Sequence, residues 1–502
     1  MGSLVRTSVF NRLRGLKCAA AVEQPAIVPA WNVRWRRRLL QLRTASNTAR
    51  PDFLQAFVAE NIEIRKQLGC FRVGRRLPLA TKAYSMKLLI SAYACAPNRG
   101  SEHSCGWNWT SEVARLGYDA TVLVSPAHRT AILAATQQDP ALQRIRWVFP
   151  EVAPWPLQQG KEPGWERIYN FLWQREALPV ARALHREHPF DLVHHLTWAG
   201  VRAPTFLGTL GVPLIIGPVG GGETAPRKLR DGFPLRGRIL EGMRDLSNAT
   251  IELNPIVRQG LRKAAVIFAR TADTKNLLSP PLRAKTYLQM ELGVTPAQIG
   301  TPRPLRKMPR KLLYAGRLLY WKGVHIAVEA MSRLVSHMPD AHLTIVGNGP
   351  EETRLKSEIT QRNLKANVTL VSWMPHEQFL RLYDTHDLFV FPSLHDSAGW
   401  VVLESICRGL PVACLNLGGP KEIVTPASGI IVDTTGLDTS GVAAGLAEEL
   451  RALLADPIRL AALSAGAIAR AGDFLLRNQV ERLYAQATEH LGGATQVRQA
   501  AA

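Results

Sequence analysis

Several patterns that define other classes of protein are missing from this 502-residue sequence. Six cysteines show neither a CxxC pair nor the paired spacing of a metal site; they are Cys18, Cys70, Cys95, Cys105, Cys407 and Cys414. Such scattered cysteines indicate reduced thiols in a cytosolic protein, and we expect Cys407 and Cys414 to be core residues. No run approaches the roughly 18 apolar residues that a membrane helix needs.

Acidic residues are scarce at the amino end. Residues 1–85 hold 16 Lys and Arg against 4 Asp and Glu, a large share of the net charge of +22 for the whole chain. We expect this basic extension to be either disordered or a mis-assigned start. Three explanations are open. It is a peripheral membrane arm, it is a targeting peptide, or the true start is Met86, which opens a strand directly. We favour the last.

From Met86 onward, apolar strand-like runs alternate with helical patterns, which predicts an α/β protein with two Rossmann-like domains. The first is expected over residues 86–300 and the second over 308–475, with a Pro- and Gly-bearing linker near 294–310. The first strand is not followed by GxGxxG, so a dinucleotide cofactor is not expected. Aromatic residues do not interleave with basic ones as in RNA-binding proteins, so nucleic acid is not an expected partner either.

The most informative stretch runs from Phe391 to Val424. The pattern predicts a buried strand, a helix that ends at Gly409 and Pro411, and a second strand that leads into Gly418-Gly419. Asp396 lies before the helix and Glu404 lies within it. Both acids can face a ligand at the carboxyl edge of the sheet, where the N–H groups after Gly399 favour a phosphate. Taken singly, Asp396 would be a helix cap and Glu404 a solvated residue.

The whole stretch resembles the signature of the family-4 (group 1) retaining glycosyltransferases, which have the GT-B fold. Pro392-Ser393, Gly399 and Glu404 match that signature, as do the segments GLPVA at 409–413 and GGPKE at 418–422. Asp396 departs from it, because the family usually has Glu there. GRLLYWKG at 316–323 resembles a second family motif, GRxxxxKG. The resemblance covers residues 86–490 and is strongest in the second domain.

The resemblance implies roles for particular residues. Arg317 and Lys322 would hold the donor diphosphate, Asp396 and His194 would contact the sugar, and Glu404 would bind the ribose. We count His194, Asp396, Arg317 and Lys322 as catalytic. The expected substrate-binding residues are Glu404, Gly399, Trp400, Gly418, Gly419, Glu422, Gly100, Ser101, His195 and Gly221. No metal and no cofactor other than the nucleotide-sugar substrate is expected.

The resemblance also implies the architecture and the activity. The two domains would face each other across a cleft, and a helix in residues 476–502 would cross back to the first domain. The reaction would move a hexose from a nucleotide-sugar to a polysaccharide, lipid-linked or other glycan acceptor with retained configuration, as in cell-envelope biosynthesis. We expect a cytoplasmic protein that can contact an anionic membrane at its inner face. The alternative is a catalytically silent nucleotide-sugar-binding protein, suggested by Asp396 and by Leu196 in place of a second HxH histidine.

Overall fold

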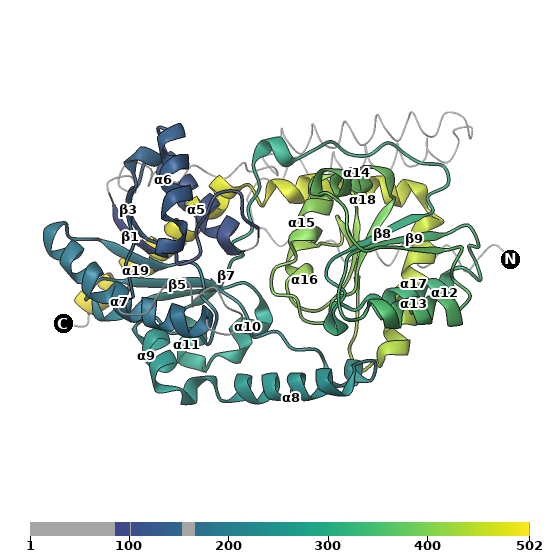
Figure 1. Ribbon diagram of the computed structural model, residues 1–502, viewed down its shortest axis with the longest axis horizontal. Helices are drawn as coiled ribbons and strands as arrows, with labels where there is room; N and C mark the ends of the chain where they lie inside the picture. Colours follow the sequence, from purple (N-terminus) through teal and green to yellow (C-terminus); the bar gives the residue numbers. More distant parts are fainter. Residues whose placement is uncertain (1–85, 101, 153–165, 501–502) are drawn as a thin grey trace, which may run out of the picture. The chain divides into compact units, whose positions relative to one another are not determined.

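The computed structural model describes residues 86–100, 102–152 and 166–500, with backbone only for 493–500. The predictions for residues 1–85 and for Ser101 therefore lie outside the described residues. By its internal contacts the chain divides into two units, 1–78 and 79–502, and only the second is described here. It contains two parallel sheets (Figure 1).

The first sheet has seven parallel strands in the order β3-β2-β1-β4-β5-β6-β7. Its strands are β1 (Lys87–Ser91), β2 (Asp119–Leu123), β3 (Arg146–Val148), β4 (Leu192–His195), β5 (Leu214–Val219), β6 (Val266–Ala269) and β7 (Thr286–Leu288). β1, β4, β5 and β6 are buried almost throughout, which explains their nearly continuous apolar sequences.

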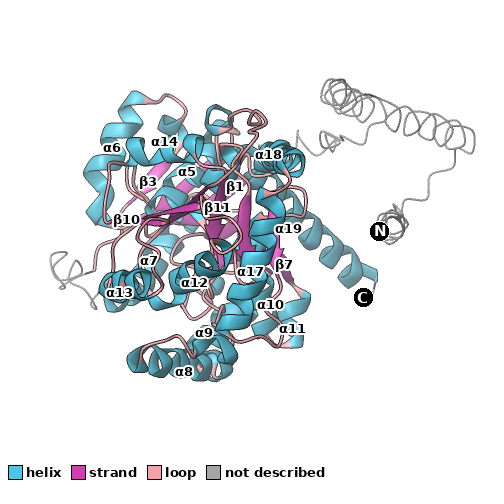
Figure 2. Cartoon of the chain, turned by 90° about the vertical axis from the view of Figure 1, so that its right-hand side faces the viewer, coloured by secondary structure: helices cyan, strands magenta, loops and turns pink. Residues whose placement is uncertain are grey.

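The helices of this part of the chain are α5 (Glu102–Arg115), α6 (Arg129–Gln138), α7 (Glu166–Glu187), α8 (Leu235–Ala249), α9 (Pro255–Lys263), α10 (Ala272–Leu277) and α11 (Pro280–Ala284). Among them, α8 lies apart from the strands, at the lower margin of the view in Figure 2. α8 ends at Ala249 and α9 starts at Pro255, where Asn254 caps α9 by accepting from the N–H groups of Ile256 and Val257.

The second sheet has six parallel strands in the order β10-β9-β8-β11-β12-β13. Its strands are β8 (Lys311–Ala315), β9 (His342–Val346), β10 (Val368–Val371), β11 (Leu388–Phe391), β12 (Val412–Leu415) and β13 (Gly429–Val432). Its helices are α12 (Val324–Leu334), α13 (Glu352–Gln361), α14 (His376–Thr385), α15 (Trp400–Cys407), α16 (Pro420–Ile423), α17 (Thr439–Leu454) and α18 (Pro457–Gly472). The 3₁₀ turn η9 (Tyr320–Lys322) precedes α12.

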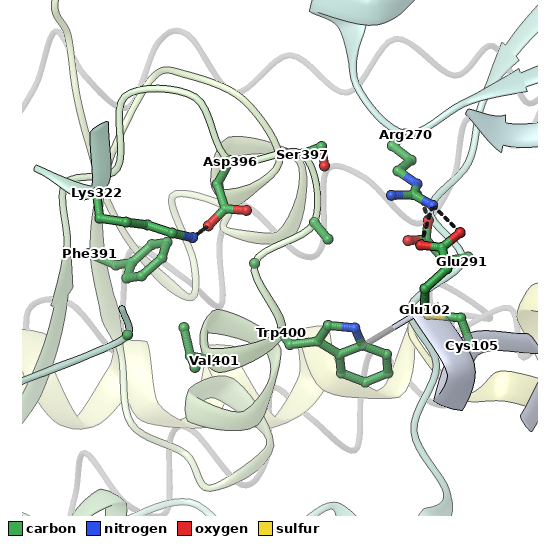
Figure 3. Close-up of a pocket in the computed structure, with 13 residues that line it drawn as sticks. Glu102, Cys105, Arg270, Glu291, Lys322, Phe391, Asp396, Ser397, Trp400 and Val401 are labelled. Atoms are coloured by element: carbon green, nitrogen blue, oxygen red, sulfur yellow. Dashed lines mark hydrogen bonds and ion pairs between the residues drawn. The ribbon is translucent and has the colours of Figure 1, made fainter. Parts of the chain in front are cut away.

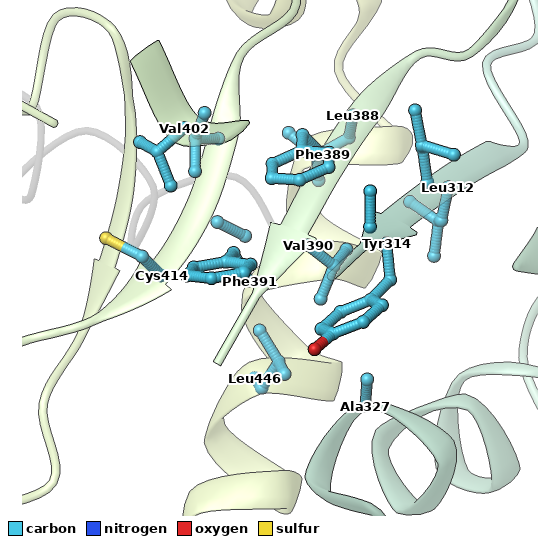
Figure 4. Close-up of a cluster of buried hydrophobic side chains, with 14 of the residues drawn as sticks. Leu312, Tyr314, Ala327, Leu388, Phe389, Val390, Phe391, Val402, Cys414 and Leu446 are labelled. Atoms are coloured by element: carbon cyan, nitrogen blue, oxygen red, sulfur yellow. The ribbon is translucent and has the colours of Figure 1, made fainter. Parts of the chain in front are cut away.

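The core of the second domain is built on β11. The Phe391 ring stacks on Tyr314 and on Phe389, with ring centroids 5.9 Å apart in both pairs (Figure 4). All three are fully buried. Cys407 and Cys414 are free thiols packed in the same cluster, so their prediction as core residues is confirmed.

The last helix, α19 (Leu476–Ala500), packs against the first domain although it follows the second in sequence. Leu476, Val480, Leu483 and Tyr484 join the same apolar cluster as Trp109 of α5. The Tyr484 hydroxyl lies 2.9 Å from Nδ1 of His194 on β4, and both residues are buried. This long-range contact ties the carboxyl end of the chain to the first sheet.

Among the described residues, no single helix is long and apolar enough to cross a membrane. One bent pair, α17 with α18, satisfies the length and composition test only when the two are joined across a bend of 100°.

Removing the Tyr484 hydroxyl tests the anchoring of α19. Tyr484→Phe leaves His194 Nδ1 buried without its partner, which costs about 1–3 kcal/mol of unfolding free energy. Tyr287→Phe is the matched control, because that hydroxyl lies 3.0 Å from His490 Nδ1 in a partly buried place near the end of the same helix. Urea unfolding should show the larger loss for Tyr484→Phe, and equal losses would contradict the anchoring role.

Candidate functional site

A cavity of ≈ 280 Å³ opens between the two sheets, at the carboxyl ends of their strands. Its second-domain wall is formed by Gly316, Lys322, Phe391 and residues 396–401. Its first-domain wall is formed by Glu102 and Cys105 of α5, by Arg270 after β6 and by Glu291 after β7 (Figure 3).

Lys322 and Asp396 form an ion pair on the second-domain wall. The Lys322 ammonium also lies 5.4 Å from the centre of the Phe391 ring. Gly323, with φ +68°, follows directly, and a Cβ there would come within 1.9 Å of the Pro392 carbonyl oxygen. The loop after β8 therefore packs tightly under the loop after β11, which brings two residues 74 positions apart together.

The predicted diphosphate ligand Arg317 lies next to Gly316 in the loop after β8 and is exposed. Gly399 and Trp400, both predicted to bind substrate, line the cavity. Gly399 adopts φ +80° and starts α15, so a glycine suits this position. The first N–H groups of α15 thus lie at the cavity edge.

Glu404 lies one turn further into α15 and does not line the cavity. The Tyr383 hydroxyl donates to its Oε2 at 3.1 Å, and His376 Nε2 lies 3.7 Å from its Oε1. Burial raises the pKa of Glu404. Both partners come from α14, whose contribution the sequence did not reveal.

Gly418 and Gly419 hold the loop that carries Asp396. The Gly419 N–H donates to the Asp396 carbonyl at 2.6 Å, and a Cβ on Gly418 would come within 2.3 Å of the same oxygen. Gly418 N–H also donates to Asp273 of α10, and Glu422 accepts from the Ala272 N–H at 3.1 Å. Gly418 and Glu422 thus make contacts that join the two domains, whereas the Gly419 N–H is engaged within the second domain.

The first-domain wall carries a cluster that the sequence did not reveal. Arg270 is 12% exposed; its Nε lies 2.9 Å from Glu291 and its Nη2 3.4 Å from Glu102. Glu102 also accepts from the Trp198 N–H at 2.9 Å. Burial raises the pKa of Glu291 to about 7, although Arg270 acts in the opposite direction. Despite its burial, Arg270 has a raised pKa because carboxylates surround it.

His194 does not reach the cavity, so its prediction as a sugar contact is wrong for this structure. It is fully buried, Nε2 lies 2.7 Å from the Gly217 carbonyl oxygen, and Nδ1 is occupied by Tyr484. Burial lowers its pKa to about 4. His195 points to the other face of the sheet, as strand alternation requires, with Nδ1 3.4 Å from Ser91 Oγ. Burial lowers its pKa to about 3, and it does not line the cavity.

The two glycine predictions in the first domain fall near the cavity but not in it. Gly100 is exposed, whereas Glu102, two residues later, lines the cavity. The Gly221 N–H donates to Glu223 at 2.9 Å and its carbonyl accepts from Arg202 at 2.7 Å. Its backbone is therefore held within the protein.

The model of the glycosyl transferases group 1 family matches residues 301–470. The second domain is a group 1 glycosyltransferase domain. It contains Arg317, Lys322, Asp396 and Glu404, so the predicted donor side of the site lies within the matched segment.

Relatives with known names support this assignment. The glycogen synthase of Mycobacterium tuberculosis is 33% identical over 186 residues, which are 37% of this chain and 43% of that protein. The chain therefore matches less than half the length of that relative. The 2-deoxystreptamine glucosyltransferase of Streptomyces kanamyceticus is 24% identical over 339 residues, 62% of this chain and 81% of that protein.

The GT-B fold is confirmed by solved structures. Sucrose-phosphate synthase of Thermosynechococcus elongatus aligns with a TM-score of 0.51 and 18% identity, covering 80% of this chain and 98% of its own. The likeness includes the first domain, which the family model does not reach.

Glu291→Gln tests the buried acid that faces the glycosyltransferase domain. The native Glu291 holds its proton to about pH 7, whereas the unfolded residue releases it near 4.5. The stabilising contribution of Glu291 is thus complete below pH 4.5 and is lost as pH rises to about 7, by up to about 3 kcal/mol. Relative to Glu291→Gln, the wild type should lose unfolding free energy between pH 5 and pH 8. Glu377→Gln, at an exposed position of α14, is the control, and parallel profiles for Glu291→Gln and wild type would contradict the assignment.

Proposed function

We propose that this chain transfers a hexosyl group from a nucleotide-sugar to a glycan or lipid-linked acceptor, with retention of anomeric configuration. The observation that carries the proposal is the Lys322–Asp396 pair beside the start of α15, inside the segment that matches the group 1 family. The names of the relatives, a glycogen synthase and a glucosyltransferase, favour a hexosyl donor and a hydroxyl-bearing acceptor.

The proposed donor site uses the second-domain wall. Lys322 and Arg317 would bind the diphosphate, and the N–H groups at the start of α15 would add their partial positive charge. Lys322 would then exchange its carboxylate partner for a phosphate, which frees Asp396 to accept hydrogen bonds from sugar hydroxyls. Glu404, oriented by Tyr383, would bind the ribose.

In the reaction, the bond between the anomeric carbon and the diphosphate oxygen breaks, and a bond from that carbon to the acceptor oxygen forms on the same face. The acceptor hydroxyl proton passes to the departing diphosphate. Lys322 and Arg317 would stabilise the negative charge that develops there. This scheme needs no metal ion and no cofactor beyond the donor.

The proposed location is the cytoplasm, at the inner face of the cell membrane. The four cysteines in the described residues are free and buried, which suits a reducing compartment. Which nucleotide the donor carries can be identified by a thermal-shift screen with UDP-, GDP- and ADP-sugars.

Lys322→Ala should lower the transfer rate by about 10²- to 10³-fold, because it removes one charged donor to the leaving group. Lys421→Ala is the matched control. Lys421 also pairs with a carboxylate, that of Asp273, and its side chain is 23% exposed against 19% for Lys322, but it lies outside the cavity. Transfer rates with the donor identified by the screen decide the outcome. A wild-type transfer rate for Lys322→Ala would contradict the assignment of Lys322 as a ligand of the diphosphate.

Asp396→Asn separates transfer from binding. It keeps the shape of the side chain and removes the charge aimed at the sugar hydroxyls. Free nucleoside diphosphate should bind within about threefold of the wild-type affinity, whereas transfer should fall by at least about 100-fold. If transfer persists while the melting temperature drops, Asp396 serves only the fold. If the wild type binds donor without transferring or hydrolysing it, the chain is a silent binding protein.

A further inference from the structure

Helix α8 presents its apolar stripe to solvent. Leu235, Ile239, Met243 and Leu246 are 74%, 56%, 62% and 66% exposed. Their spacing of four, four and three residues places them on one face of the helix. The apolar side chains of a surface helix ordinarily face the core, whereas those of α8 face the solvent.

The opposite face of α8 is fixed against the protein by small and polar residues. A Cβ on Gly237 would already touch the Tyr320 ring at 3.2 Å. Glu241 lies 3.0 Å from His395, with both side chains almost fully buried, and also accepts from the Ala225 N–H. Asn248 donates to the Gly222 carbonyl at 3.0 Å. These contacts span the helix from one end to the other, so its outward orientation is set by the fold.

The apolar surface continues past the end of α8. Leu253 is 76% exposed and Ile256, at the start of α9, is 37% exposed. With Leu240, which is 43% exposed, seven large apolar side chains are thus exposed within 22 residues. Both views show α8 at the lower margin of the described part (Figures 1 and 2). Patches of this kind mark a binding surface rather than ordinary scatter.

The same segment is strongly basic. Residues 227–263 hold nine Arg and Lys against four Asp and Glu. Of the four acids, Glu241 is buried against His395, and Asp245 is bonded to Arg230. Arg236 is exposed and adjoins the stripe, and the Arg227 side chain is 88% exposed. The exposed charge beside the apolar stripe is therefore mostly positive.

We propose that α8 and the start of α9 bind the surface of an anionic lipid bilayer. The apolar stripe would enter the boundary between headgroups and acyl chains, while the flanking arginines contact anionic headgroups. The charge complementarity favours this occupant over a second copy of the chain, because two such basic faces would repel each other. This surface deepens the membrane location proposed above, but the vesicle test needs no sugar transfer, so lipid binding and transfer can fail separately.

The test uses the full chain and vesicles of phosphatidylcholine, with and without about 30% phosphatidylglycerol as the anionic lipid. Co-sedimentation should occur with the anionic vesicles and weaken as salt rises. Met243→Glu with Leu246→Glu should lower the partition coefficient by about tenfold or more. Met308→Glu with Ile458→Glu is the matched control, because those side chains are 69% and 59% exposed in the second domain and the charge change is equal.

Each outcome bears on the proposal. Equal binding by wild type and the α8 variant overturns it, and assigns any lipid binding to another part of the chain. An equal loss in both variants also overturns it, as a general charge effect. A dimer that the α8 variant converts to monomer, with vesicle binding unchanged, assigns the surface to a second copy. If the Glu variant is poorly folded by circular dichroism, Met243→Ser with Leu246→Ser replaces it and must show a loss in the same direction.

Discussion

The tight contact between the loop after β11 and the glycines after β12 is the constraint on which the site depends. The Asp396 carbonyl accepts from the Gly419 N–H, and the missing Cβ of Gly418 makes room for that approach. The residues around this contact then meet three other parts of the protein. His395 meets Glu241 of α8, the Asp396 carboxylate meets Lys322, and Ser397 packs beside Gly220 of the first domain. One short loop thus fixes the cavity and its walls together.

The two cavity walls differ in whether their cations are available to bind a phosphate. On the second-domain wall, Lys322 and Asp396 balance each other and exposed Arg317 lies close by. A diphosphate can therefore be received there. On the first-domain wall, Arg270 is already engaged by Glu102 and Glu291, so it offers little to a phosphate. Because the pKa of Glu291 is raised to about 7, the charge of this wall changes near neutral pH.

The sequence predicted the second domain well because its signals are local. The Gly399 start of α15, the acids eight residues apart and the glycines at 418–419 all lie within one strand-helix-strand unit. The Glu102–Arg270–Glu291 cluster spans 189 positions, so no local pattern could join its members. His194 lies on a strand that is buried on both faces, and no local pattern in the sequence shows that Tyr484 of the last helix occupies its ring nitrogen. The spacing of the apolar residues in α8 is that of an ordinary amphipathic helix, so the sequence does not show that this face is exposed.

Only a few direct contacts separate the proposed lipid surface on α8 from the cavity. Its outer face carries Met243 and Leu246, and its inner face carries Glu241, which contacts His395 directly before Asp396. Trp321, directly before Lys322, stacks on the His395 ring at 5.1 Å. Both residues of the cavity ion pair therefore adjoin residues of the packing that holds α8. The Glu241–His395 pair is buried and tolerates little displacement, because separating the two side chains would leave buried polar groups without partners. Docking α8 on a bilayer would consequently fix the distance and orientation of the cavity relative to the membrane surface.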